Sequence, residues 1–140
     1  MTCFSHRLRH ISLIVLLAVV AGCGGEQPAS EPLRPQFSSI FRNVIKPNCA
    51  IPGCHVGTMP ESQLNMENAD FTYQQLVGKP STFMPDWQLV HPGDAGRSYI
   101  IQKLTGGTIV GERMPSGKPP LPDSVIVIIR EWIDSGALQN

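Results

Sequence analysis

The stretch Cys49-Ala50-Ile51-Pro52-Gly53-Cys54-His55 carries two thiols five positions apart and a histidine directly after the second thiol. Two such thiols can add to the vinyl groups of a porphyrin as thioethers, and the adjoining histidine then lies beside the iron. The common form of this attachment motif is C-x-x-C-H, whereas four residues separate the cysteines here. The stretch therefore predicts one covalent haem c per chain, bound through Cys49 and Cys54, with His55 as an axial ligand.

Residues 1–22 have the features of a secretory signal peptide. Arg7 and Arg9 make its start basic, and the apolar run over residues 11–21 is shorter than the ~20 residues that a membrane-spanning helix needs. The run ends in Val20-Ala21-Gly22-Cys23, which resembles the lipobox of bacterial lipoproteins, whose cysteine is lipidated and becomes the first mature residue. We expect Cys23 to be this lipidation site, whereas an ordinary signal peptide cleaved nearby would leave its thiol free.

Residues 23–35 are rich in Gly, Glu, Gln, Pro and Ser, and they predict a flexible tether to a folded domain over residues 36–140. Several acyl chains would anchor the protein to a membrane, because each buried CH₂ group contributes ~0.8 kcal/mol. Gly24 follows Cys23, and the absence of an aspartate there favours the outer membrane. We therefore expect a location in the bacterial cell envelope, facing the periplasm or the cell surface.

The composition excludes other classes of protein. Cleavage before Cys23 leaves about 118 residues, enough for one domain with a modest core. Acidic side chains then slightly outnumber basic ones, so nothing indicates a nucleic-acid partner. We find no Ser/His/Asp set, no phosphate-binding glycine loop and no distinctive carboxylate pair, and we predict that the protein is not an enzyme.

Two segments show apolar residues at the spacing of one helix face, i, i+3, i+4, i+7 and i+8. The first segment, between Pro35 and Pro47, holds Phe37, Ile40, Phe41, Val44 and Ile45. The second, between Pro122-Asp123 and Gly136, holds Val125, Ile128, Ile129, Trp132 and Ile133. The flanking prolines and glycine suit helix ends, and Trp132 on the apolar face predicts a core residue.

Two shorter helices are expected between these segments. One covers residues 71–77, with Asp70 as N-cap and Gly78 as C-cap, and the other covers residues 96–104. The remaining sequence is rich in Gly and Pro and shows no alternation typical of strands. The predicted fold class is therefore all-α.

The order of these features resembles class I c-type cytochromes, and most closely the small monohaem domains of bacterial envelope lipoproteins. The C-terminal parts of those domains often read PGD…S…I…KL…RMP…L…I..WI..GA. The matching residues here are Pro92-Gly93-Asp94, Ser98, Ile100, Lys103-Leu104, Arg113-Met114-Pro115, Leu121, Ile129, Trp132-Ile133 and Gly136-Ala137. The resemblance covers residues 37–137. It implies a small cytochrome c-like helical domain around one haem, which exchanges electrons with redox partner proteins in the envelope.

The second axial ligand is less constrained by the sequence. Met59 lies only four residues after His55 and cannot easily reach the opposite face of a haem. Met66 and Met84 could reach it, and His91 is the candidate for a second histidine ligand.

Met114 is the expected iron ligand opposite His55. It precedes Pro115 in a Gly/Pro-rich segment just before the last predicted helix, and proline favours an extended backbone at the residue before it. The resemblance to c-type cytochromes points to the same Met-Pro position. A Met/His pair raises the potential of the iron relative to two histidines.

Three alternatives fit part of the pattern. In an oxidising compartment Cys49 and Cys54 can form a disulfide in a haem-free structural or binding lipoprotein, which leaves His55 unexplained. The same three residues can contribute to a zinc or copper site. Finally, a haem that lacks a sixth ligand can bind a gas or perform peroxidase chemistry. Tyr99, which could reach a haem propionate, is equally well placed for the surface.

Overall fold

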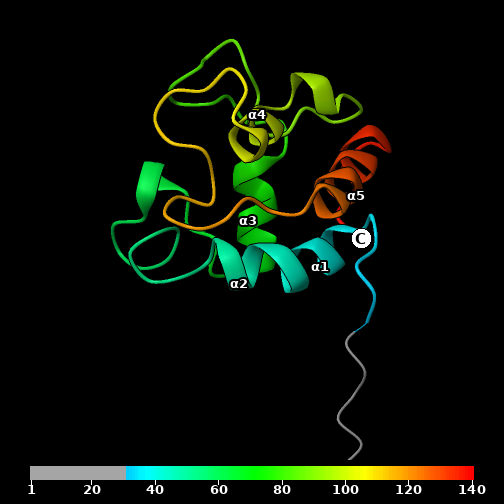
Figure 1. The fold of residues 1–140 in the computed structure, drawn as a ribbon, viewed down its shortest axis with the longest axis horizontal. Coiled ribbons are helices and arrows are strands. Elements are labelled where there is room, and N and C mark those ends of the chain that lie inside the picture. The colour runs from blue at the N-terminus through cyan, green and yellow to red at the C-terminus, as the bar shows by residue number, and fades with distance from the viewer. Residues whose placement is uncertain (1–30) are drawn as a thin grey trace, which may run out of the picture. The chain divides into compact units, whose positions relative to one another are not determined.

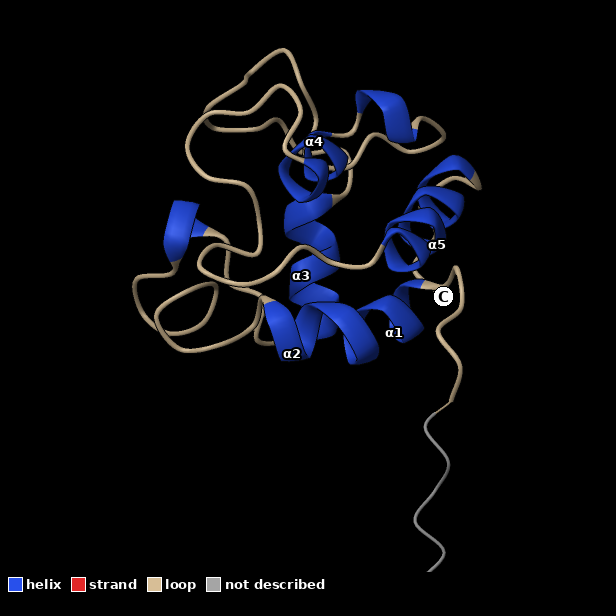
Figure 2. Cartoon of the chain, viewed as in Figure 1, coloured by secondary structure: helices blue, strands red, loops and turns tan. Residues whose placement is uncertain are grey.

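The computed structural model describes residues 31–140 (Figure 1). The predicted signal peptide, residues 1–22, and the expected lipidation site Cys23 lie outside the described residues. All named elements of the described part are helical, and it contains no strand (Figure 2). The predicted all-α fold class is confirmed for this part of the chain.

The first helix ends one residue later than the sequence predicts. α1 (Phe37–Ile40), a π-helical turn (Phe41–Ile45) and α2 (Lys46–Asn48) follow one another without a break. Pro47 was expected to end this helix, but the helix continues past it. In the π turn the Lys46 N–H donates to the Phe41 carbonyl, five residues back. This wider turn makes room for the proline ring, which would otherwise clash with the carbonyl of the preceding turn.

Asn140 caps the start of the first helix. The Phe37 N–H donates to the Asn140 side-chain oxygen at 2.9 Å, and the Ser38 N–H donates to the Asn140 backbone carbonyl at 2.8 Å. Gln36, at the N-cap position, offers no side-chain hydrogen bond. A residue more than a hundred positions away therefore satisfies N–H groups that have no partner within the helix.

α3 spans Ala69–Leu76 and starts two residues before the predicted helix. Its N-cap is Asn68, not Asp70, because the Asn68 side chain accepts hydrogen bonds from the N–H groups of Asp70 and Phe71. Both residue types are good N-caps, so the sequence alone does not choose between them. Val77, not Gly78, is the C-cap.

α4 spans Tyr99–Thr105, whereas the sequence predicted a start at residue 96. Residues Ala95–Arg97 form a separate 3₁₀ turn, in which the Asp94 carboxylate accepts the N–H of Arg97 at 3.0 Å. Ser98 is extended and separates this turn from α4. Gly106 ends α4 in the left-handed conformation, with φ of 78°, as is common at helix C-termini.

α5 spans Asp123–Asp134, and its apolar face enters the core as predicted. Trp132 is only 2% exposed, which confirms its placement in the core. Phe37 packs with a ring-centroid distance of 5.5 Å to Trp132 and 5.1 Å to Tyr73. These aromatic contacts join α1, α3 and α5. None of the helices in the described residues has the length and apolar character needed to cross a bilayer.

The last part of the expected tether contacts this helical unit. Leu33 packs against the core, and the Arg34 N–H donates to the Ser39 hydroxyl at 3.0 Å. An exposed ion pair joins Glu31 to Arg42 at 3.1 Å. Residues 31–35 therefore belong with the helical unit in the structure.

Candidate functional site

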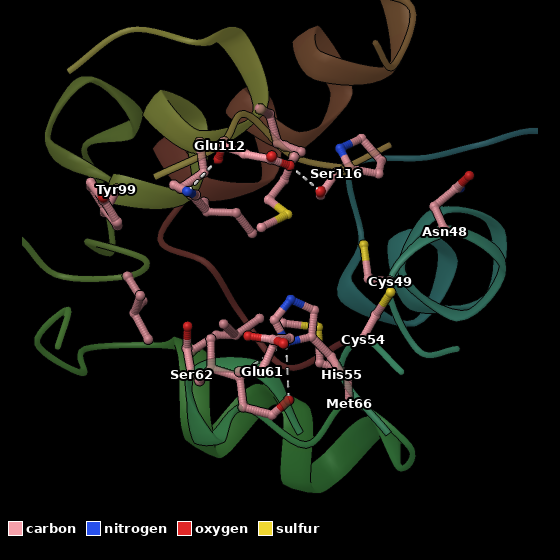
Figure 3. A pocket seen from close by; sticks show the side chains of 18 of the residues that line it. Asn48, Cys49, Cys54, His55, Glu61, Ser62, Met66, Tyr99, Glu112 and Ser116 are labelled. Atoms are coloured by element: carbon pink, nitrogen blue, oxygen red, sulfur yellow. Dashed lines mark hydrogen bonds between the residues drawn. The ribbon is translucent and has the colours of Figure 1, made fainter. Parts of the chain in front are cut away.

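A cavity of about 460 Å³ lies between the loop after α2, helices α3 and α4, and residues 112–118 (Figure 3). Sites for small molecules and cofactors usually measure roughly 300–1,000 Å³. Its lining surface is mainly apolar and includes the side chains of Ile51, Leu64, Met66, Leu76, Phe83, Leu89, Ile100 and Leu104. The cavity has the size and apolar character that an organic cofactor requires.

Both cysteines of the motif face this cavity (Figure 3). The Cys49 N–H continues the helical hydrogen bonding of α2 by donating to Ile45 at 2.8 Å. The chain then folds back, so that the His55 N–H donates to the Cys49 carbonyl at 3.2 Å. Gly53 adopts φ of 80° in this turn. The four residues between the cysteines form a tight turn, and both free thiols therefore lie on the same side of the cavity.

Burial raises the pKa of the Cys49 thiol to about 11. Nearby Lys118 opposes this shift, and Cys54 adds to it. At neutral pH Cys49 is therefore a neutral thiol. The surroundings of Cys49 therefore favour the thiol over the thiolate in the haem-free protein.

Two backbone carbonyls determine which nitrogen of His55 carries the hydrogen. Nδ1 lies 3.1 Å from the carbonyl oxygen of Glu61 and 3.2 Å from that of Leu64. Because a carbonyl can only accept, Nδ1 must be the protonated nitrogen and donate to them. In the neutral ring, Nε2 is then the nitrogen with the free lone pair, and the ring faces the cavity (Figure 3). Histidines that bind metals are usually oriented in this way, by a hydrogen bond from the other nitrogen.

The loop that supplies these carbonyls has an unusual backbone. Ser62 and Gln63 both adopt left-handed conformations, with φ of 56° and 59°. The Glu61 N–H also donates to the Cys54 carbonyl at 2.8 Å, which ties the loop to the cysteine motif. Sequence reasoning missed this loop, because neither Ser nor Gln signals a left-handed conformation as Gly or Asn would.

The opposite wall of the cavity is formed by residues 112–116. Glu112 and Ser116 lie across the cavity from His55 (Figure 3). Met114 lies between them in the sequence and also lines the cavity. Its N–H donates to the Lys103 carbonyl at 2.8 Å, which joins this wall to α4.

The other candidates for the second ligand are placed less favourably. Met66 lines the cavity on the same side as His55, and its N–H donates to the His55 carbonyl at 2.6 Å (Figure 3). Met59 is 93% exposed and borders a different, shallower hollow. Met84 and His91 are not among the residues that line the cavity. The structure thus brings together Cys49, Cys54, His55 and Met114.

Tyr99, Lys103 and Lys118 are among the polar residues of the cavity to which the sequence assigns no role. Tyr99 is 3% exposed, although its sequence position suited the surface equally well. Lys103 and Lys118 also line the cavity. Their position depends on how α4 and residues 112–118 fold together, which no local motif indicates.

Among the described residues, no group of three His, Cys, Asp or Glu side chains is arranged to hold a metal ion. Comparisons of this chain with protein-family models, curated proteins and solved structures found no match. Its function is therefore inferred from the cavity itself.

Proposed function

We propose that this chain is a monohaem c-type cytochrome of class I that carries electrons in the bacterial cell envelope. The observation that carries the proposal is the donor set around one apolar cavity. Two thiols lie together at one side, a histidine with a free Nε2 faces the cavity, and a methionine lines the opposite wall. These are the groups that attach and ligate haem c.

Each residue of the set has a distinct role in this proposal. Cys49 and Cys54 would hold the haem through thioethers, and His55 and Met114 would ligate its iron. The haem supplies the one-electron chemistry when it is bound. The chain orients His55 through the Glu61 and Leu64 carbonyls, and the apolar lining keeps water away.

The proposal extends to the envelope location. Lipid on Cys23 anchors the protein to the outer membrane, facing the periplasm or the cell surface, and the tether lets the helical domain reach redox partner proteins. Cys23→Ser should move the protein from the membrane fraction to the soluble fraction. A wild-type protein that is already soluble and begins at another residue would contradict the anchor.

The histidine assignment can be tested with a matched pair of variants. The protein is produced together with a haem-maturation system, and its visible spectrum is recorded. His55→Ala should alter the haem spectrum strongly, because it removes an axial ligand. His91→Ala should leave the spectrum unchanged, since His91 does not line the cavity. Haem bands that are absent from the wild type, or that survive unaltered in His55→Ala, would refute the proposed function.

A further inference from the structure

A lysine of α4 contacts the cavity wall that carries Met114. We name residues 106–116 the distal strap. The Lys103 ammonium group donates to the carbonyl of Val110 at 3.0 Å and to the carbonyl of Glu112. The Lys103 backbone carbonyl accepts the N–H of Met114 at 2.8 Å. One residue is therefore hydrogen-bonded to the distal strap through both its side chain and its backbone.

The distal strap is held mainly by such polar contacts. Pro115 is its buried residue, Met114 is half-buried, and Val110 is 46% exposed. Segments with few buried apolar contacts have low local stability. Individual hydrogen bonds to α4 therefore decide where the distal strap lies.

Lys103 differs from the other residues of α4 that bond to the distal strap, because its donor group is charged. The Tyr99 hydroxyl accepts the Val110 N–H at 3.0 Å, and the Gln102 side chain accepts the Thr108 N–H at 3.1 Å. Both are bonds between neutral groups. A hydrogen bond from a charged ammonium is roughly twice as strong. The Lys103 side chain also joins two carbonyls of the strap, close to Met114.

We infer that Lys103 is a positioning residue, whose ammonium group fixes the distal strap so that Met114 lies across the cavity from His55. The role of Met114 as a ligand rests on the proposed function. The hydrogen bonds from Lys103 to the distal strap do not depend on the proposed function, and their effect can be measured in protein without haem.

The test compares Lys103→Met with Lys118→Met in the purified full-length protein. Lys118 also lines the cavity, but no hydrogen bond joins its ammonium group to the described residues, so it is a matched control. Hydrogen exchange is measured at the N–H groups of Val110 and Met114. Lys103→Met should speed exchange at both roughly tenfold or more, the effect expected from losing hydrogen bonds to a charged group. Lys118→Met should not change it.

A second readout connects the strap to the iron. A methionine sulfur on ferric haem gives a weak absorption band near the red end of the visible spectrum. Lys103→Met should weaken that band, and Lys103→Arg, which keeps a cation able to reach both carbonyls, should restore much of it. Exchange at Ile129 and Ile133 in α5 should stay slow, which shows that the core is still folded. If Lys103→Met unfolds the core, the test rests on Lys103→Arg. Slow hydrogen exchange at Val110 and Met114 in that variant supports the role of Lys103.

Unchanged exchange at Val110 and Met114 in Lys103→Met would overturn the inference. Equal acceleration in Lys118→Met, or an unprotected strap in Lys103→Arg, would overturn it as well. If the wild type lacks haem or the red band, the proposed function or its Met114 ligand fails. The exchange rates of the distal strap still decide the role of Lys103 in that case.

Discussion

The two walls of the cavity are held in place by different kinds of interaction. On one wall, the Nδ1–H group of His55 donates to two backbone carbonyls of a compact loop, and these hydrogen bonds fix the ring. The distal strap, which includes the opposite wall, is attached to α4 largely through side chains such as Lys103 and Tyr99. The position of His55 should therefore tolerate most side-chain substitutions in its loop, whereas the position of Met114 should depend on particular side chains.

The largest effect on stability should come from the core that supports both walls. Trp132→Ala should lower the free energy of unfolding by about 3–5 kcal/mol, because it leaves a cavity among α1, α3 and α5. The matched control is Val127→Ala in the same helix, which is 49% exposed and should change stability by less than ~0.5 kcal/mol. Denaturant unfolding measures both. Equal effects of the two substitutions would show that Trp132 does not support the core.

Met114→Ala tests the distal wall directly. It should abolish the red absorption band of the ferric protein, lower the reduction potential and open a site for added ligands, because the thioether ligand is gone. Met84→Ala should keep the band, since Met84 does not line the cavity. Spectra and potentiometry of the two variants provide the comparison. Loss of the band in Met84→Ala but not in Met114→Ala would assign the ligand to the other loop.

Ser62 tests whether the wall of His55 depends on backbone conformation. Ser62→Val should lower the free energy of unfolding by about 1–2 kcal/mol, because a β-branched residue is strained at its left-handed φ of 56°. Ser62→Gly removes only the hydroxymethyl group and should keep the haem spectrum of the wild type. Unfolding and visible spectra measure both variants. A spectrum altered by Ser62→Gly would mean that the serine side chain, rather than the backbone, orients His55.

The smallest effect concerns Cys49 and is confined to alkaline pH. Burial raises the pKa of this thiol from 9.0 to about 11. Between these two pH values the folded haem-free protein keeps the proton of the Cys49 thiol, whereas the unfolded chain releases it. The resulting stabilisation is fully present below about pH 9 and is lost as pH rises towards about 11.

A thioether at Cys49 cannot titrate, so the haem-loaded protein should lack this alkaline loss of stability. Urea midpoints at pH 8 and near pH 11 are compared for haem-free and haem-loaded protein, with Cys49→Ala in the haem-free protein as control. The same alkaline loss in both wild-type forms, absent from Cys49→Ala, would contradict attachment at Cys49.

The helices were largely predictable because their pattern is local. The spacing of Phe37, Ile40 and Val44, and that of Ile129, Trp132 and Ile133, places each set on one helix face, and the structure buries these residues. The errors occur where a distant contact or an equivalent neighbour decides the outcome. The cap from Asn140 is such a distant contact, and the choice of Asn68 over Asp70 as N-cap is a choice between equivalent neighbours.

The cavity was predictable in part for the same reason. Cys49, Cys54 and His55 form a contiguous motif, and the structure places all of them at the cavity. The carbonyls that orient His55 are placed by the left-handed backbone of Ser62 and Gln63, and neither residue type predicts that conformation. The hydrogen bonds from Lys103 join residues of α4 to the distal strap, and only the folded chain brings them together.

The central claim is that one haem is attached covalently through Cys49 and Cys54. Its most direct test is the intact mass of protein made with a haem-maturation system and then fully denatured. We predict that the wild type carries the added mass of one haem with no free thiol at either position, and that the double variant Cys49→Ser, Cys54→Ser carries none. A denatured wild-type protein without the added mass, and with both thiols free or joined in a disulfide, would contradict the claim.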